Sequence, residues 1–250
     1  MAIEVFNRYE HKYLLDRKTF DSVIKILDGH MVLDAHNAGH RPYTISNIYF
    51  DTPDDYLIRT SLSKPVYKEK LRLRAYGVPR ADAKVYLEIK KKFNGIVNKR
   101  RTALCLNEAY DFVLSGKALT LRDYMNRQVL REIEYFLTVY DVAPKLYLAY
   151  DRIAYFEKGN SDLRISFDRN IRSRQYDLRL ENGDYGERLF SEETYLMEIK
   201  TSLAKPLWLA HALSALDIKR RSFSKYGTVF EQKMRSHGCE DTEPKYKEAV

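Results

Sequence analysis

The chain has 250 residues, enough for one large domain or two small ones, and its 43 lysines and arginines against 35 acidic residues give a net charge of +8. This balance favours an anionic partner such as nucleic acid, a membrane surface or a phosphorylated small molecule, although a solvated basic surface would carry the same charge. Two distant cysteines give no disulfide framework, so we expect a reducing, cytoplasmic location. No apolar stretch approaches the roughly 20 residues that span a bilayer.

The first third of the chain mixes strand and helix signals. Asp16 is placed to cap a helix whose apolar residues share one face, and Thr52-Pro53 is typical of a helix start. We expect strands at residues 5–14, 43–50 and 68–76, and helices at 16–28 and 53–62.

The clearest local element is a hairpin. Asn94-Gly95 lies between two alternating runs and is typical of a two-residue turn. Counting outward from this turn places Lys90 opposite Lys99 and Glu88 opposite Arg101. Because like charges directly opposite one another destabilise a sheet, the lysine pair indicates a ligand that neutralises both.

The remaining elements are mostly strands with helices inserted between them, which differs from alternating βαβ units. Asn107 and Ser224 are placed to cap two of the helices. We expect helices at 107–115, 121–140, 206–216 and 224–235, and strands at 85–93, 96–104, 145–155, 163–169, 171–180 and 194–201. The sequence therefore predicts a single α+β domain over residues 1–235, an antiparallel closed β-barrel of about eight strands with peripheral helices, and a polar, flexible tail over 236–250.

Charged residues share one face on several of these strands. Lys70, Arg72 and Arg74 alternate with apolar residues, and a single strand of this kind usually turns its charged face to water. Taken together, the strands favour apolar faces under helices and charged faces inside the barrel. Buried unpaired cations cost several kcal/mol each, and here they outnumber the carboxylates. Such an interior needs an anionic ligand with many charges.

These residues resemble the catalytic domain of the vacuolar transporter chaperone (VTC) polyphosphate polymerases, within the triphosphate tunnel metalloenzyme superfamily. The resemblance runs from Phe6 to about Phe230 and includes Tyr150-Asp151-Arg152. The matching segments lie at residues 8–13, 48–52, 70–77, 87–90, 99–101, 150–152, 164–168, 197–200 and 223–226. The superfamily often opens with Glu-x-Glu-x-Lys, whereas Arg8 stands here in place of the first glutamate. This exchange removes one metal ligand and favours the polymerase branch over the hydrolases.

The resemblance implies a tunnel enzyme that transfers the γ-phosphoryl group of ATP to a growing polyphosphate chain, with Mn²⁺ or Mg²⁺ as cofactor. It implies the catalytic residues Lys12, Arg72, Arg74, Lys90, Arg152 and Glu198. It implies the substrate-binding residues Arg8, Lys70, Lys99, Arg101, Arg164, Lys200, Ser224 and Lys225. Glu198 is the first choice of metal ligand, and Glu10, Glu88 and Asp168 are further candidates. Ser224 fits a helix cap equally well.

Two other functions fit the same residues. A tunnel hydrolase would use the same cations and metal to cleave inorganic or nucleoside triphosphate. A non-enzymatic module would bind polyphosphate or nucleic acid, but carboxylates on the cationic faces would repel a nucleic-acid backbone, so we expect no nucleic-acid partner. ATP and inorganic polyphosphate or triphosphate are the expected ligands, and a separate membrane partner stays open. There is no Gly-x-x-x-x-Gly-Lys-Ser/Thr loop, so this is not a P-loop enzyme.

Overall fold

A computed structural model describes residues 9–94, 96–116, 119–202 and 204–237. The strands are β1 (Tyr9–Leu15), β2 (Met31–Leu33), β3 (Tyr43–Asp51), β4 (Tyr67–Tyr76), β5 (Lys84–Phe93), β6 (Ile96–Cys105), β7 (Ala143–Glu157), β8 (Asn160–Arg174), β9 (Glu187–Arg188) and β10 (Tyr195–Thr201). The helices are α1 (Arg17–His30), α2 (Tyr56–Leu62), α3 (Leu106–Ser115), α4 (Arg127–Val139), α5 (Leu207–Ala215) and α6 (Lys225–His237), with a short 3₁₀ segment η1 (Ala35–His40). The α+β class predicted from the sequence is confirmed.

All the strands belong to one antiparallel sheet, in the order β1-β10-β8-β7-β3-β4-β5-β6, with β2 beside β7 and β9 beside β8. The predicted hairpin register is confirmed, since Lys90 pairs with Lys99 and Glu88 with Arg101. The sheet therefore places the charged positions of β4, β5 and β6 side by side.

The predicted closed barrel is not confirmed, because no hydrogen-bonded ladder joins β1 to β6 in the described part of the chain. The sheet nevertheless curves far enough that Glu10 of β1 and Arg101 of β6 border the same cavity. An eight-stranded barrel closed by hydrogen bonds has an interior just wide enough for its side chains. An open seam between the two edge strands leaves room for a cavity between the charged faces.

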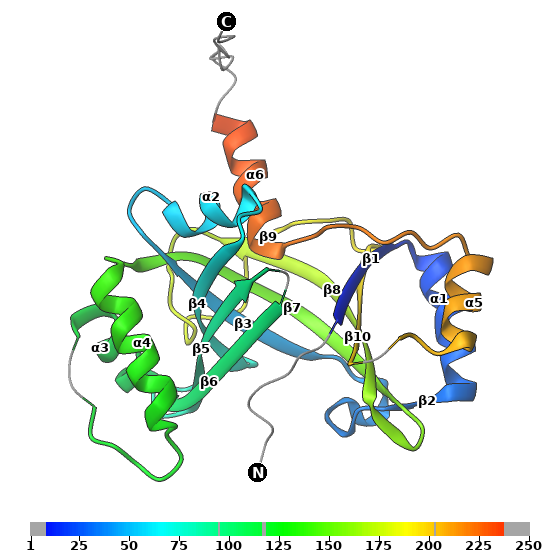
Figure 1. The fold of residues 1–250 in the computed structure, drawn as a ribbon, viewed down its shortest axis with the longest axis horizontal. Coiled ribbons are helices and arrows are strands. Elements are labelled where there is room, and N and C mark those ends of the chain that lie inside the picture. Colours follow the sequence, from blue (N-terminus) through cyan, green and yellow to red (C-terminus); the bar gives the residue numbers. More distant parts are fainter. Residues whose placement is uncertain (1–8, 95, 117–118, 203, 238–250) are drawn as a thin grey trace, which may run out of the picture.

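The helices cover the apolar faces of the sheet, and two groups lie at opposite sides of the molecule (Figure 1). Helices α3 and α4 pack on the outer faces of β4, β5 and β6, where Leu71 and Leu73 are fully buried against Val129 and Ile133. Helices α1 and α5 pack on β1, β8 and β10 in the same way. Because neighbouring residues on a strand point to opposite faces, the cations between these leucines must point inward.

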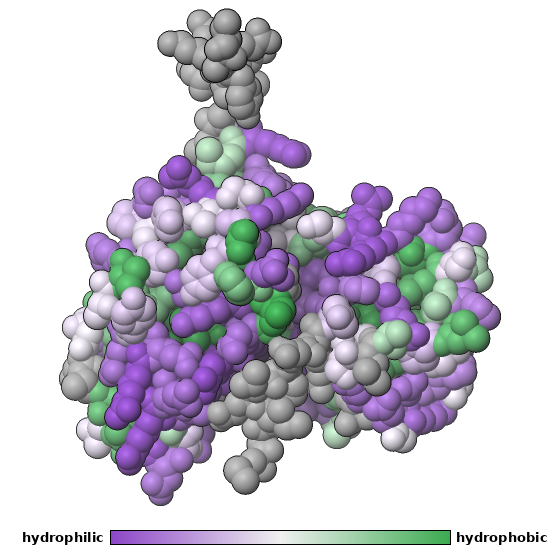
Figure 2. Space-filling view, viewed as in Figure 1, coloured by the Kyte–Doolittle hydropathy of each residue, from purple (hydrophilic) through white to green (hydrophobic). Residues whose placement is uncertain are grey.

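Hydrophilic residues dominate the face of the molecule shown in Figure 2, and hydrophobic residues form only small separate patches there. No described helix is long and apolar enough to cross a membrane.

Three helix starts differ from the prediction because nearby side chains satisfy different backbone N–H groups. Helix α2 begins at Tyr56 instead of near Pro53, since the Asp51 carboxylate accepts hydrogen bonds from the backbone of residues 57 and 58. Helix α3 is capped at Cys105, two residues before the predicted cap Asn107. Helix α4 begins after Asn126, whose side chain accepts from the third residue beyond it, and not at residue 121.

Two predicted strands are one. Residues 163–169 and 171–180 were expected to be separate, but β8 continues through Asn170 to Arg174. Asn170 has φ 48°, and asparagine tolerates this left-handed conformation well, so the sheet absorbs an irregularity in the β7–β8 pairing instead of ending there. Strands β2 and β9 and segment η1 were not predicted. The residues at 5–8 and 238–250 lie outside the described residues, while Ser236 and His237 belong to α6.

Candidate functional site

The charged faces of the sheet surround a cavity of about 780 Å³. Among the described residues, eleven lysines and arginines line it: Lys12, Lys70, Arg72, Arg74, Lys90, Lys99, Arg101, Arg152, Arg164, Lys200 and Lys225. Only two carboxylates line it, those of Glu10 and Glu198. Even with the buried carboxylates of Asp168, Glu88 and Asp34 behind the lining, the cations outnumber the carboxylates by more than two to one. The cavity therefore favours a ligand with several negative charges.

All the site residues predicted from the sequence line this cavity except Arg8, Glu88 and Asp168. Arg8 lies outside the described residues. Glu88 is fully buried under three cations, with 2.7 Å from its carboxylate to Arg72, 2.7 Å to Lys99 and 3.8 Å to Arg74. These three contacts make Glu88 a counter-charge that orders the cations, and they hold its pKa well below the ordinary value despite the opposing effect of burial.

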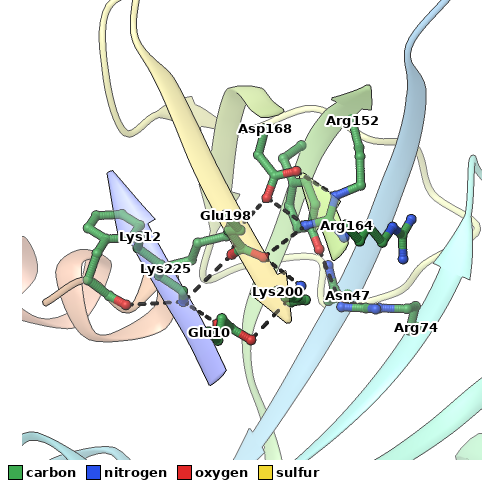
Figure 3. Close-up of polar contacts among 12 residues, drawn as sticks. Glu10, Lys12, Asn47, Arg74, Arg152, Arg164, Asp168, Glu198, Lys200 and Lys225 are labelled. Atoms are coloured by element: carbon green, nitrogen blue, oxygen red, sulfur yellow. Dashed lines mark hydrogen bonds and ion pairs between the residues drawn. The ribbon is translucent and has the colours of Figure 1, made fainter. Parts of the chain in front are cut away.

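The opposite wall of the cavity carries a second buried carboxylate cluster (Figure 3). Arg152 of β7 donates to both oxygens of Asp168 on β8, at 2.6 and 2.8 Å. Lys225, the first residue of α6, donates to Asp168 at 2.6 Å and to Glu198 of β10 at 3.1 Å. Thus a residue from the last helix is joined directly to β8 and β10 and, through Asp168, to Arg152 of β7.

Glu198 is the point where this cluster meets the cavity. Lys200 donates to it at 2.9 Å, and Lys12 of β1 lies 3.6 Å away. Burial acts to raise the pKa of Glu198, but Lys200, Lys225 and the other cations hold it well below the ordinary value. Glu198 is therefore ionised at neutral pH, which a metal ligand requires.

Glu10 lies beside Glu198, because the same two lysines contact both. Lys12 is 3.2 Å and Lys200 is 3.9 Å from the Glu10 carboxylate. Carboxylate oxygens, together with phosphate oxygens and water, are the ligands that Mg²⁺ and Mn²⁺ prefer. The described residues contain no group of three acidic, histidine or cysteine side chains that could hold a metal alone. Glu198 and Glu10 thus fit a metal that shares its coordination with a bound phosphate, whereas the Asp168 carboxylate is fully buried behind Arg152 and Lys225.

The β4–β5 wall contrasts with this cluster. Lys70 pairs with Lys90 across the two strands, and Lys90 pairs with Lys99. Lys99 contacts Glu88, but no described carboxylate lies within 4.0 Å of the amino group of Lys70 or Lys90. Burial and the neighbouring cations lower the pKa of Lys70 to about 7. Glu10 acts to raise the pKa of Lys90, but burial and nearby cations lower it to about 8.

The cap predicted for Ser224 is present, and its predicted contact with phosphate stays a prediction. Its hydroxyl accepts a hydrogen bond from the backbone of Gly227 at 3.2 Å, as a cap residue does, and the side chain also lines the cavity. The sequence analysis missed the tyrosines of the lining, Tyr43, Tyr49, Tyr76, Tyr86, Tyr124, Tyr150 and Tyr226. The inward positions of the five strand tyrosines were readable from the alternation, but tyrosine fits a buried wall as well as a site, and Tyr124 and Tyr226 lie outside the strands.

Comparison with known proteins assigns the chain to a family. The model of the VTC domain matches residues 7–232. This chain belongs to the VTC domain family. No curated protein matches it in sequence. Among solved structures, a Bacillus halodurans protein provisionally assigned as an adenylate cyclase shares 15% identity and a TM-score of 0.52, covering 88% of this chain and 96% of its own. The Hippeastrum protein HpAC1, a provisionally assigned adenylyl cyclase described as having a dominant triphosphatase activity, shares 17% identity and a TM-score of 0.50, covering 92% and 96%.

At these identities the two structures show a common fold. The VTC family membership, the shared fold and the cation-lined cavity together support a triphosphate-tunnel function.

Proposed function

We propose that this VTC domain protein is a metal-dependent polyphosphate polymerase that uses ATP as phosphoryl donor. The terminal oxygen of a polyphosphate chain attacks the γ-phosphorus, the bond from that phosphorus to the β–γ bridging oxygen breaks, and ADP leaves. The observation that carries the proposal is the surplus of cations in the lining of a cavity that also contains ionised Glu198. Phosphoryl transfer needs mainly positioning and neutralisation of charge, which such a cavity supplies.

The role that we propose for each residue follows from the side chains that it contacts in the free protein. Arg72, Arg74 and Arg152 are held by buried acceptors, so their guanidinium groups are fixed before a phosphate arrives. Among the described residues no such acceptor holds Lys70 or Lys90, and phosphate oxygens would supply one. Glu198 and Glu10 would hold Mn²⁺ or Mg²⁺, which when bound neutralises phosphate oxygens. Residues 1–235 would act as one unit, because β1 and α6 contribute to the same cavity.

Hydrolysis is the second candidate, because the Hippeastrum protein with this fold is described as having a dominant triphosphatase activity. Water would then be the attacking group, and the same cations and metal would position and neutralise the triphosphate. The two reactions differ only in the acceptor.

The deciding experiment incubates the purified chain with ATP and Mn²⁺, and separately with Mg²⁺, with and without a short polyphosphate primer. Polyphosphate length is followed on gels, and free phosphate is measured in the same samples. Chains that lengthen while ADP forms support the polymerase. Free phosphate without longer chains assigns hydrolysis, and binding of polyphosphate without turnover of ATP would overturn both enzymatic functions.

A further inference from the structure

The two ends of the cavity differ in chemistry. The inward positions of β4 and β5 continue past Lys70 and Lys90 to the pair formed by Lys68 and Lys92. Lys68 lies near enough to Lys92 that the neighbouring charge, after burial, helps to lower its pKa. This end therefore continues the row of cations outward from the cavity.

The tyrosines near this lysine end are already engaged. Tyr226 is buried and donates its hydroxyl proton to Asp51 at 3.0 Å. Tyr49 is buried, accepts a hydrogen bond from Arg72 at 3.0 Å and lies 5.1 Å from the Tyr226 ring. These two buried rings therefore offer a ligand much less exposed aromatic surface than a tyrosine at the mouth of the cavity would.

At the opposite end, where β4 finishes, three tyrosines form a row along the cavity lining, Tyr43, Tyr76 and Tyr86. The ring centroids of Tyr43 and Tyr76 are 6.0 Å apart, and those of Tyr76 and Tyr86 are 5.8 Å apart. Tyr76 is 51% exposed and meets its neighbours at 54° and 81°, so neither neighbour stacks flat on its ring. Tyr76 thus offers an aromatic face at the mouth of the cavity.

Arginines stand beside this tyrosine row on the side of the cavity. The Arg101 guanidinium lies 4.8 Å from the centre of the Tyr86 ring, and Arg164 donates to the Tyr43 hydroxyl at 3.4 Å. Both arginines line the cavity. An aromatic face followed directly by fixed positive charge matches a molecule with a flat base at one end and phosphates at the other.

We propose that the row of Tyr43, Tyr76 and Tyr86 is a nucleoside subsite, in which the base of a nucleoside triphosphate stacks on Tyr76. This inference rests on the proposed function, because it assumes that the cavity holds the triphosphate. It gives the cavity a direction: the nucleotide enters at the tyrosine end, and the phosphate chain extends toward Lys68 and Lys92. Because any base can stack on tyrosine, the subsite favours nucleotides over inorganic triphosphate without selecting one base strongly.

The test compares ATP with inorganic tripolyphosphate, both measured by calorimetry on the full chain without metal. Tyr76→Ala should weaken ATP binding about 30-fold, the middle of the range for loss of one stacked base, and leave tripolyphosphate binding unchanged. Tyr76→Phe should behave like the unchanged protein because it keeps the aromatic face. Tyr135→Ala is the matched control, since Tyr135 is an exposed tyrosine on α4 that does not line the cavity.

The possible outcomes test the nucleoside subsite separately from the proposed phosphate-binding function. Equal weakening of both ligands by Tyr76→Ala, or no effect on either, overturns the nucleoside subsite and leaves the phosphate site intact. Failure of the unchanged protein to bind tripolyphosphate overturns the proposed function itself. Selective loss of ATP binding, restored in Tyr76→Phe, supports the subsite.

Discussion

The two walls of the cavity carry similar numbers of cations, but they differ in how these cations are paired with carboxylates. On the wall formed by β7, β8, β10 and α6, Arg152 and Lys225 are paired with buried carboxylates (Figure 3). On the β4–β5 wall, Lys70 and Lys90 face each other, and no carboxylate of the described residues pairs with either. The pKa of Lys225 is raised, because Asp168 and Glu198 outweigh the effect of burial, whereas the pKa of Lys70 is lowered to about 7.

This difference teaches how a highly basic interior can be folded before its ligand arrives. The paired wall compensates its own charges and is ordered in advance. On the β4–β5 wall, Lys70 and Lys90 lose part of their positive charge because their pKa values are lowered. They become protonated again when phosphate oxygens approach. The comparison predicts that substitutions on the first wall affect folding and chemistry, and substitutions on the second affect the pH dependence of binding.

The largest expected effect is on stability. Asp168→Ala leaves Arg152 and Lys225 buried without their main acceptor, and removal of one partner from a buried ion pair costs about 3–5 kcal/mol. The free energy of unfolding from urea titration should fall by that amount. Asp82→Ala, which removes a carboxylate that is 85% exposed, is the control and should change it little. A small loss in Asp168→Ala would mean that the paired wall does not depend on this carboxylate.

The next effect concerns turnover. Glu198→Gln removes the charge that a metal requires, so metal-dependent turnover of ATP should fall at least about 100-fold, since charge stabilisation dominates phosphoryl transfer. Binding of polyphosphate without metal should survive, because the cations remain. Glu192→Gln changes an exposed glutamate and should leave both unchanged. Unchanged turnover in Glu198→Gln would remove Glu198 from the metal site.

The third effect is a pH dependence of binding. In the free protein the pKa values of Lys70 and Lys90 are about 7 and 8, and a bound polyanion raises both. Binding therefore takes up protons, and tripolyphosphate affinity should fall as pH rises from 7 to 9, by up to about tenfold per pH unit for each proton taken up. Calorimetry in buffers of different ionisation enthalpy counts these protons. Affinity that stays constant over this range contradicts the lowered pKa values.

The last prediction concerns how Lys70 of the same wall makes the stability of the free protein depend on pH. Unfolded Lys70 has a pKa near 10.5, so the unfolded chain binds more protons than the folded one between about pH 7 and 10.5. The contribution of Lys70 to stability therefore rises with pH across this window and is least favourable below it. Lys70→Met should remove this slope, stabilise the free protein slightly near pH 7 and weaken tripolyphosphate binding. Thermal unfolding at pH 7 and pH 9.5 measures the slope, and an unchanged slope would show that Lys70 is not responsible.

The sequence predicted the contents of the site better than its arrangement. The charged residues of the strands could be assigned to one face, and all the predicted site residues within the described part of the chain except Glu88 and Asp168 line the cavity. Glu88 was taken as a candidate metal ligand because it shares that face. Its enclosure by Arg72, Arg74 and Lys99 depends on three adjacent strands and could not be read from any one of them.

What the sequence determined by itself is local. The alternation of side chains across a strand is fixed by backbone geometry, and a two-residue turn fixes a hairpin register, so the pairing of Lys90 with Lys99 followed from Asn94-Gly95. The tertiary structure decided which charges meet across long sequence separations, such as Lys225 with Asp168, and which do not, such as Lys70. It also left the sheet unclosed by hydrogen bonds in the described part of the chain, and it gathered three tyrosines at one mouth. These outcomes depend on strand order and sheet curvature, which arise from the packing of helices on the apolar faces and are not written in any single segment.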